Sequence, residues 1–399
     1  MGKPKIRFQG YTEDWEQRKL GDVLKERTER AQGGEELLSV TIANGVIRQA
    51  DSEKRNIASE DKSNYKIVRK GDVPYNSMRM WQGAVGNSEY DGIVSPAYTV
   101  LIPSDEANAK FFMEYFKKEN SLQLFQRWSQ GLTSDTWNLK YPTLSSMRFS
   151  MPSIEEQNRI AEYFDALDHL ITLHQRKCDE TKKLKKYMLQ KMFPQNGHSV
   201  PEIRFSGFTE DWEQRKLDDI AEFSKGSGYS KGDLTESGTP IILYGRLYTK
   251  YETIISDVDT YVEAKEGSVY SKGGEVIIPA SGETAEDIAR AATIDKSGIL
   301  LGGDLNIVMP NEDINSAFLA ISISNGNSQL ELAKKAQGKS VVHIHNEEIR
   351  NLIVPFPTKT EQNKIVDYFS GLDHLITLHQ QKCEKLQKIK KFMLQNMFV

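Results

Sequence analysis

The chain has 399 residues, 38% hydrophobic and 27% charged, a composition typical of a globular protein large enough for two or more domains. It argues against a membrane protein, because no stretch approaches the roughly 18 apolar residues of a membrane span, and two cysteines without an apolar secretion signal favour the cytoplasm. The formal net charge of −4 argues against indiscriminate binding of polyanions but is compatible with a local basic groove.

The first clear pattern is an opening segment that the chain uses twice. IRFQGYTEDWEQRKLGDV starts at Ile6, and IRFSGFTEDWEQRKLDDI starts at Ile203. Internal repeats indicate a protein built from equivalent units, so we expect two halves with a common framework.

Each opening segment leads into about 135 residues that the two halves do not share. In the first half, YTVLIP is typical of a strand and NAKFFMEYFKKENSLQLFQRW is typical of a helix. Turn signals such as KGD separate the segments. We predict a compact domain of mixed strands and helices over residues 1–150.

A long helix is predicted next, over residues 156–193, which contain no proline or glycine. Apolar or small residues recur there at spacings of four and three, at Ile160, Phe164, Leu167, Ile171, His174 and Cys178. A helix of 38 residues is about 57 Å long, too long to lie on one small domain. Its seam needs a partner, and the second copy over residues 361–398, identical at about two-thirds of its positions, is available.

The linker PQNGHSVPE and a second divergent domain separate the long helices. GEVIIPA and NLIVPFP are typical of strands, and NSAFLAISISNGNSQLELAKKA predicts a helix interrupted around Asn325–Gly326. The predicted order is a first domain over 1–150, a spacer helix over 151–195, a linker over 196–202, a second domain over 203–355 and a second spacer helix over 356–399.

The predicted fold class is α+β, with two mixed α/β domains joined by two long helices that form a coiled-coil spacer in a pseudo-two-fold tandem repeat. Either direction of helix pairing is sterically open. Equivalent halves close on themselves most simply when the helices run antiparallel. Cys178 and Cys383 would then lie roughly 12 Å apart along the helix axis, beyond the reach of a disulfide.

This order of parts resembles the specificity subunits of type I restriction–modification systems. The resemblance covers essentially the whole chain and rests on the alternation of variable domain and shared helix, and on the opening segment WEQRKLGDV. It also rests on the junctions MRFSMPSIEEQNRIAEYF from Met147 and IRNLIVPFPTKTEQNKIVDYF from Ile349. It implies a non-catalytic subunit whose two target-recognition domains each read one half of a split DNA target, while the helices set the gap.

The resemblance also implies the partners. They are double-stranded DNA, two methyltransferase (modification) subunits that methylate adenine, and restriction (translocase and nuclease) subunits. S-adenosylmethionine, ATP and Mg are expected on those partner subunits, with no cofactor and no metal bound by this chain. The sequence agrees, because it contains neither a Pro-Pro-Tyr or Pro-Pro-Phe element nor a glycine-rich cofactor loop.

Candidate DNA contacts are side chains that can donate hydrogen bonds to base edges or stack on bases. In the first domain, KIVRKGDVPYNSMRMWQG supplies Lys70, Tyr75, Asn76, Arg79, Trp81 and Gln82. SQGLTSDTW, which resembles a family segment near DNA, adds Gln130, Thr133 and Ser134. In the second domain, LYGRLYTKY and KKAQGKSVVHIH supply Tyr244, Arg246, Tyr248, Lys250, Lys335, Lys339, Ser340 and His343.

Two other functions compete with this interpretation. One is an enzyme with its own nuclease or methyltransferase site. DVDTYVEAK has the spacing of a nuclease triad, and AQGKS is similar to a phosphate-binding loop, although Ala333 stands where that motif needs glycine. The other is a coiled-coil scaffold for proteins. The His174–Cys178 pair has the spacing of metal ligands on a helix, but small polar groups in a helix seam explain it better.

One property fits DNA binding poorly. Residues 218–355 contain 21 acidic and 12 basic side chains, a net charge of −9, whereas residues 21–150 are neutral with 17 of each. Because neutralisation of phosphates supplies much of DNA affinity, the acidic side chains should lie away from DNA, or partner subunits should supply positive charge.

Overall fold

The computed structural model describes residues 2–52, 58–195, 198–338 and 341–399. The chain divides into two compact units. Unit 1 comprises Met1–Arg176 and Gln380–Val399, and unit 2 comprises Lys177–His379. Each unit therefore combines one divergent domain with one end of each long helix.

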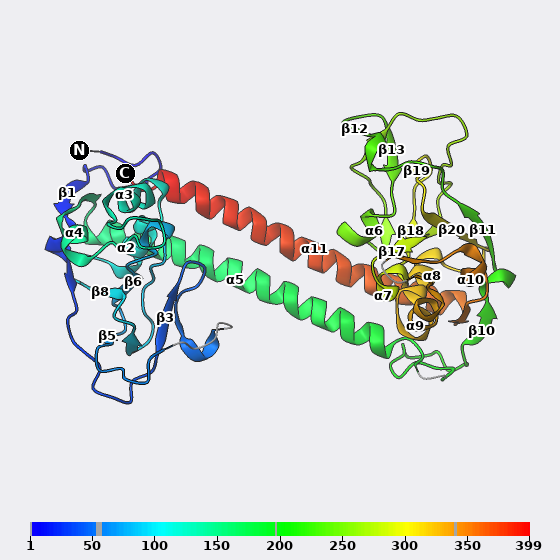
Figure 1. The fold of residues 1–399 in the computed structure, drawn as a ribbon, viewed down its shortest axis with the longest axis horizontal. Coiled ribbons are helices and arrows are strands. Elements are labelled where there is room, and N and C mark those ends of the chain that lie inside the picture. The colour runs from blue at the N-terminus through cyan, green and yellow to red at the C-terminus, as the bar shows by residue number, and fades with distance from the viewer. Residues whose placement is uncertain (1, 53–57, 196–197, 339–340) are drawn as a thin grey trace. The chain divides into compact units, whose positions relative to one another are not determined.

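Unit 1 is built around a three-stranded antiparallel sheet with the order β2–β8–β6. The other strands of this unit form the pairs β1–β9, β3–β4 and β5–β7, and Figure 1 labels one strand of each pair. Its elements are β1 (Glu16–Lys19), α1 (Leu20–Val23), β2 (Leu24–Glu26), β3 (Leu38–Thr41), β4 (Gly45–Arg48), β5 (Lys66–Val68), β6 (Val73–Asn76), β7 (Gly92–Val94), β8 (Tyr98–Pro103), α2 (Ala109–Phe116), α3 (Glu119–Trp128), α4 (Tyr141–Ser146) and β9 (Arg148–Met151). The predicted strand YTVLIP is β8.

The helix predicted from NAKFFMEYFKKENSLQLFQRW is two helices, α2 and α3. Lys118 adopts an extended conformation between them, and its Nζ donates to the carbonyl of Phe398 at 2.7 Å. Lys117 and Lys118, the two residues between α2 and α3, are both good helix formers. The break therefore reflects a tertiary contact that local sequence does not encode.

Unit 2 has a five-stranded sheet with the order β11–β20–β16–β18–β14 and a four-stranded sheet with the order β12–β15–β13–β19. Its elements are β10 (Glu213–Lys216), β11 (Ala221–Lys225), β12 (Leu234–Thr235), β13 (Thr239–Ile242), α6 (Arg246–Thr249), β14 (Ile254–Ile255), β15 (Tyr261–Val262), β16 (Glu275–Pro279), β17 (Ser281–Gly282), α7 (Ala285–Ile288), β18 (Ala292–Ile294), β19 (Leu300–Leu301), β20 (Leu305–Pro310), α8 (Ser316–Ile323), α9 (Gly326–Lys335), β21 (Val342–His343), α10 (Asn346–Arg350) and β22 (Ile353–Phe356). The predicted strands in GEVIIPA and NLIVPFP and the predicted helix interruption are confirmed by β16, β22 and the boundary of α8 and α9.

The divergent domains share a central framework. In unit 1, β6 pairs with β8, and the Leu139 amide donates to the Ser77 carbonyl just beyond β6 at 2.8 Å. In unit 2, β16 pairs with β20, and the Ile344 amide donates to the Ala280 carbonyl just beyond β16 at 3.0 Å. The same backbone arrangement therefore recurs under sequences that show little resemblance.

The long helices are α5 (Ile154–Lys191) and α11 (Lys359–Asn396), each of 38 residues. The predicted length is confirmed, and both helices start and end two residues earlier than predicted. In the described part of the chain, no helix combines the length and apolar composition that a membrane span requires.

Contacts within each unit show that the two helices run antiparallel. In unit 2, Cys178 Sγ lies 3.9 Å from the Ile376 carbonyl oxygen, and Lys185 donates to Asp373 at 2.6 Å. Residue numbers thus rise along α5 as they fall along α11. In unit 1 the same contacts recur 205 positions away, between Cys383 and Ile171 at 3.4 Å and between Lys390 and Asp168 at 2.7 Å. Both cysteines are buried, and neither forms a disulfide.

The core of each unit contains the helix end that comes from the other half of the sequence. In unit 1, Trp15 of the first opening segment packs edge-on against Phe398, with ring centroids 6.4 Å apart. In unit 2, Trp212 packs against Phe193 at 6.0 Å. Both tryptophans are fully buried. Neither repeat therefore encodes a complete core by itself.

Candidate nucleic-acid interface

In unit 1, three of the predicted contact residues line one cavity of about 1050 Å³. Asn76 stands at the end of β6, and Arg79 and Gln82 follow in the turn and short 3-10 helix beyond it. The opposite wall is the β3–β4 hairpin, whose tip carries the half-exposed Ile42. Amide and guanidinium groups in one open cavity are well suited to reading base edges.

The second predicted segment of unit 1 lies against the first. Two backbone hydrogen bonds between Gln130 and Asn138, of 3.1 and 2.8 Å, close a loop that we call bridged loop 1 (residues 130–138). Trp137 of this loop packs edge-on against Trp81 at 5.2 Å, and Asp135 lies 3.8 Å from Arg79. Sequence reasoning selected both segments, and the fold brings them together.

Bridged loop 1 exposes its polar side chains. Thr133 and Ser134 are exposed, and Gln130 is exposed at the closing bridge. The loop is braced internally, since the Thr133 amide donates to the Thr136 hydroxyl at 3.1 Å. Leu132 is fully exposed at the tip.

The prediction of a base contact by Tyr75 is wrong. The ring is fully buried in the unit 1 core, and its hydroxyl donates to the Leu139 carbonyl at 3.0 Å. Burial raises the pKa of this phenol, so it remains a donor. Tyr75 fixes the start of the segment after bridged loop 1 rather than contacting a ligand.

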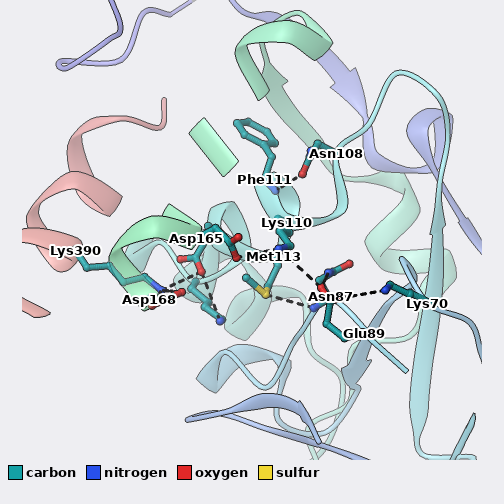
Figure 2. A network of polar contacts seen from close by, with 12 residues as sticks. Lys70, Asn87, Glu89, Asn108, Lys110, Phe111, Met113, Asp165, Asp168 and Lys390 are labelled. Atoms are coloured by element: carbon teal, nitrogen blue, oxygen red, sulfur yellow. Dashed lines mark hydrogen bonds and ion pairs between the residues drawn. The ribbon is translucent and has the colours of Figure 1, made fainter. Parts of the chain in front are cut away.

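Lys70 is exposed but does not line the cavity. Figure 2 shows it beside Glu89, with its Nζ 3.7 Å from the carboxylate, next to a network that includes Lys110 and Asp165. A contact between Lys70 and DNA stays a prediction, separate from the cavity.

In unit 2, predicted residues from two segments again meet beyond the equivalent strand. The Tyr248 hydroxyl donates to the Ser281 carbonyl at 2.7 Å, and the Ser281 hydroxyl lies 3.2 Å from His343 Nδ1. Tyr244 is part-exposed and packs edge-on against Tyr248 at 6.2 Å. Burial raises the pKa of Tyr248, which keeps its hydroxyl protonated.

His343 belongs to bridged loop 2 (residues 337–343), the counterpart of bridged loop 1. Its closing hydrogen bonds between Gln337 and His343 measure 3.0 and 2.8 Å. The predicted residues Lys339 and Ser340 belong to this loop but lie outside the described residues. Lys335 precedes this loop, and its ammonium group donates to the Asn351 carbonyl at 3.1 Å.

Two basic residues predicted for unit 2 form ion pairs with carboxylates. Arg246 is buried, with contacts of 2.9 Å to Asp259 and 2.7 Å to Glu252. Lys250 is exposed and lies 3.0 Å from Asp259. Direct base contact would require the buried Arg246 guanidinium to leave both carboxylates, so we remove Arg246 from the candidate interface.

Sequence reasoning missed the residues that follow β16. Ser281 and Gly282 stand where Met78 and Arg79 stand in unit 1, and Arg290 lies 5.9 Å above the Tyr248 ring. A side chain at Gly282 would lie 3.0 Å from the Tyr248 hydroxyl, so this close approach favours glycine. A signal was present: KGDV before β6 matches GGEV before β16.

Two residues that suggested a nuclease site, Asp259 and Lys265, have separate ionic partners. Asp259 contacts Arg246 and Lys250, while Lys265 forms an ion pair with Asp233, whose pKa falls to about 2 because of that contact. Among the residues that the structure describes, no group of three or more His, Cys, Asp or Glu side chains is placed to hold a metal ion.

The type I restriction modification DNA specificity domain matches this chain twice, over residues 12–183 and 209–388. The type I restriction enzyme MjaVIII specificity subunit of Methanocaldococcus jannaschii is 23% identical over 342 residues, which cover 82% of this chain and 77% of that protein. A putative MjaX specificity subunit from the same organism is 21% identical over 433 residues, which cover 95% and 91%.

Solved structures show a similar fold. The S subunit of a type I restriction–modification system from M. genitalium aligns over 100% of this chain and 99% of its own, with a TM-score of 0.62 and 14% identity. A chain from a study of complex assembly and conformational transition in the type I R-M system aligns over 96% and 97%, with a TM-score of 0.52 and 17% identity.

Proposed function

This chain belongs to the type I restriction–modification DNA specificity family, and on that premise we propose that each unit reads one half of a bipartite DNA target. The recognition domains would be residues 1–150 and 203–355. The spacer helices, over 151–195 and 356–399 with the linker 196–202 between the halves, would set the gap. Catalysis belongs to other subunits of such systems, and the role of this chain is DNA sequence recognition.

The observation that carries this proposal is that the two units share one backbone framework but present different polar side chains on it. The segment after β6 and bridged loop 1 present Arg79, Gln82 and Thr133. The segment after β16 and bridged loop 2 present Ser281 and His343 at the equivalent place. A repeated framework with unlike polar groups is what two different half-sites require.

The side chains suit readout of bases. Arg79 matches the O6 and N7 acceptors of guanine, and Asn76 and Gln82 match the adenine edge. Thr133 and Ser134 can serve phosphates or bases, and Trp81 supports bridged loop 1. In unit 2, Tyr244 offers a ring for stacking and His343 offers a ring nitrogen, whereas the Tyr248 hydroxyl donates its proton to Ser281 and can only accept from DNA.

The acidity of unit 2 is compatible with this role. Many of its exposed carboxylates lie at residues 233–266, and several are paired internally, including Asp257 with Lys296 at 2.6 Å and Asp259 with Lys250 at 3.0 Å. Such pairs weaken repulsion of phosphates. We infer that positive charge for phosphate contact comes largely from partner subunits.

We propose that those partners are two methyltransferase subunits, one bound to the long helices in unit 1 and one bound to the long helices in unit 2. Unit 1 exposes Leu170 and Phe392, and unit 2 exposes their repeat counterparts Leu375 and Tyr187. Exposed large apolar side chains that recur at equivalent positions favour two equivalent protein contacts. S-adenosylmethionine, ATP and Mg would bind the methyltransferase and restriction subunits, and the complex would act on DNA in the cytoplasm.

The test is a map of methylated adenines in cells that express the methyltransferase partner with and without this chain. We expect a motif of two short half-sites, with one methylated adenine on each strand, that depends on the chain. A single uninterrupted motif, or methylation that does not require the chain, would contradict the proposal.

A further inference from the structure

The first turns of each long helix carry the sequence Glu-Gln-Asn, and these three side chains hold two parts of the recognition head. Glu156 is 1% exposed and accepts two hydrogen bonds of 2.7 Å from the Arg7 guanidinium of the opening segment. In unit 2, Glu361 is fully buried and accepts two bonds of 2.7 Å from Arg204.

The next two residues hold the start of the helix that follows the central sheet. The side-chain oxygen of Gln157 accepts from the backbone amide of Asn108 at 3.0 Å, and the side-chain oxygen of Asn158 accepts from the Asn108 side chain at 2.7 Å. Asn108 is itself the N-cap of α2 and accepts from the Phe111 amide at 2.9 Å. One side chain thus joins the cap of α2 to the first turn of α5.

The same bonds recur in unit 2 despite the divergence of the domains. Gln362 accepts from the Asn315 amide at 2.7 Å, Asn363 accepts from the Asn315 side chain at 2.8 Å, and Asn315 caps α8. We call this set, with its arginine, the Glu-Gln-Asn clamp.

The clamp contributes direction more than stability. Apolar burial also attaches each head to its helix, but it is not directional. A buried ion pair adds little net stability over apolar residues of similar volume, whereas a bidentate guanidinium–carboxylate pair restricts distance and angle together. Buried charges kept at the same place under two divergent domains therefore point to a geometric role.

We propose that the two clamps are positioning elements that fix each head on its spacer helix, so that the complex accepts one gap length and rejects gaps one base pair shorter or longer. This inference rests on the proposed function. One base pair displaces a half-site by about 3.4 Å and rotates it by about 35°. A head that can tilt on its helix would tolerate such a displacement, while the contacts that read bases stay unchanged.

The experiment uses the complex of the full chain with its methyltransferase partner and duplexes that carry both mapped half-sites at the natural gap and at gaps one base pair shorter and longer. The variant is Arg7→Met with Glu156→Met, which removes both charges and leaves neither unpaired. We expect methylation of the altered gaps, relative to the natural gap, to rise about tenfold, because misplacement no longer excludes them. The penalty for a base change within a half-site should not change.

Three further variants sharpen the result. Arg204→Met with Glu361→Met should have the same effect from unit 2. Arg18→Met with Glu106→Met removes an exposed pair of 2.8 Å in unit 1 and should leave the gap preference at the wild-type value. Asn158→Ala removes one exposed bond of the clamp and should cause a smaller rise, and it carries the test if the double variants do not fold.

An unchanged gap preference in a clamp variant whose thermal unfolding midpoint matches the wild type would overturn the inference. A rise of equal size in the exposed-pair variant would overturn it too, because the effect would then not belong to the clamp. If the wild-type complex itself shows no gap preference, the proposed function fails instead.

Discussion

Apart from the Glu-Gln-Asn clamp that they share, the two units attach their recognition heads to the same pair of helices by different chemistry. In unit 1, Lys390 of α11 contacts Asp168 of α5 at 2.7 Å and the buried Glu114 of α2 at 3.0 Å. Lys110 of α2 adds a second ionic contact to Asp165 at 2.9 Å (Figure 2). An ionic network therefore links the recognition head of unit 1 to α5 and α11.

Unit 2 retains the helix half of that network and replaces the head half. Lys185 and Asp373 form the equivalent helix–helix pair at 2.6 Å. Aligned on the N-caps Asn108 and Asn315, α8 has the buried Ile321 where α2 has Glu114, and Ala317 where α2 has Lys110. The repeated helices thus accept either a polar or an apolar head surface, and the divergent domain decides which.

Removal of Lys390 should have the largest effect on stability. Lys390→Met leaves Glu114 buried without its close partner, and we expect a loss of about 3–5 kcal/mol in the free energy of unfolding. Lys185→Met breaks a partly exposed pair and should cost about 1 kcal/mol or less. Urea unfolding of both variants measures the difference, and equal losses would contradict the ionic character of unit 1.

Disruption of one exposed apolar pair should remove one partner subunit. Leu170→Lys with Phe392→Lys in unit 1 places two charges on the proposed contact, and loss of a central apolar residue typically costs about 2 kcal/mol or more. Mass measurement of the purified complex should then show one methyltransferase subunit instead of two. Leu375→Lys with Tyr187→Lys is the matched variant in unit 2. Retention of both partners by either variant would refute this contact surface.

Substitutions at the two candidate interfaces should each alter one half-site. Arg79→Ala should cost about 1–3 kcal/mol in DNA binding and relax one position of the unit 1 half-site, and His343→Ala should do the same for the unit 2 half-site. Methylated-adenine maps read both effects. Lys70→Ala is the control and should leave both half-sites intact, since Lys70 does not line the cavity. Changes in both half-sites from one substitution would argue against independent reading.

Conversion of unit 1 to the unit 2 pattern should have the smallest effect. Glu114→Ile removes a buried carboxylate and leaves Lys390 paired with Asp168. Because a buried ion pair and an apolar side chain are often nearly equivalent, we expect a change within about 1 kcal/mol, measured by the same urea titration. A loss as large as that of Lys390→Met would mean that Glu114 has a further role.

Sequence reasoning predicted the framework well because the framework is regular. A 38-residue stretch without proline or glycine and with an apolar seam specifies a long helix, and its duplication identifies the pairing partner. The break at Lys118 and the insertion of Phe398 into unit 1 could not be predicted, because they depend on contacts across 280 and 383 residues, respectively.

The candidate site was only partly predictable for a related reason. Donors near a turn signal selected Asn76, Arg79 and Gln82, and the structure places all three in one cavity, while their contact with DNA stays a prediction. Alternation along β6 does not distinguish Tyr75 from a surface ring, because β6 is buried on both faces at that point. Likewise, the sequence does not show that the acidic side chains nearby hold Arg246 in the protein.

The exchange of helix ends between the halves also sets the order in which the two units can complete their folding. Unit 2 is complete once residue 379 has left the ribosome, but unit 1 needs residues 380–399, including Phe398 for its core. Roughly 200 residues separate Arg176, where the α5 part of unit 1 ends, from residues 380–399. At a translation rate of about 5–20 residues per second, the nascent first domain waits about 10–40 s for them. Domains usually fold in the order in which they are translated. Here the domain made first is completed last, and its unfinished apolar surface is open to chaperones until residues 380–399 have been translated.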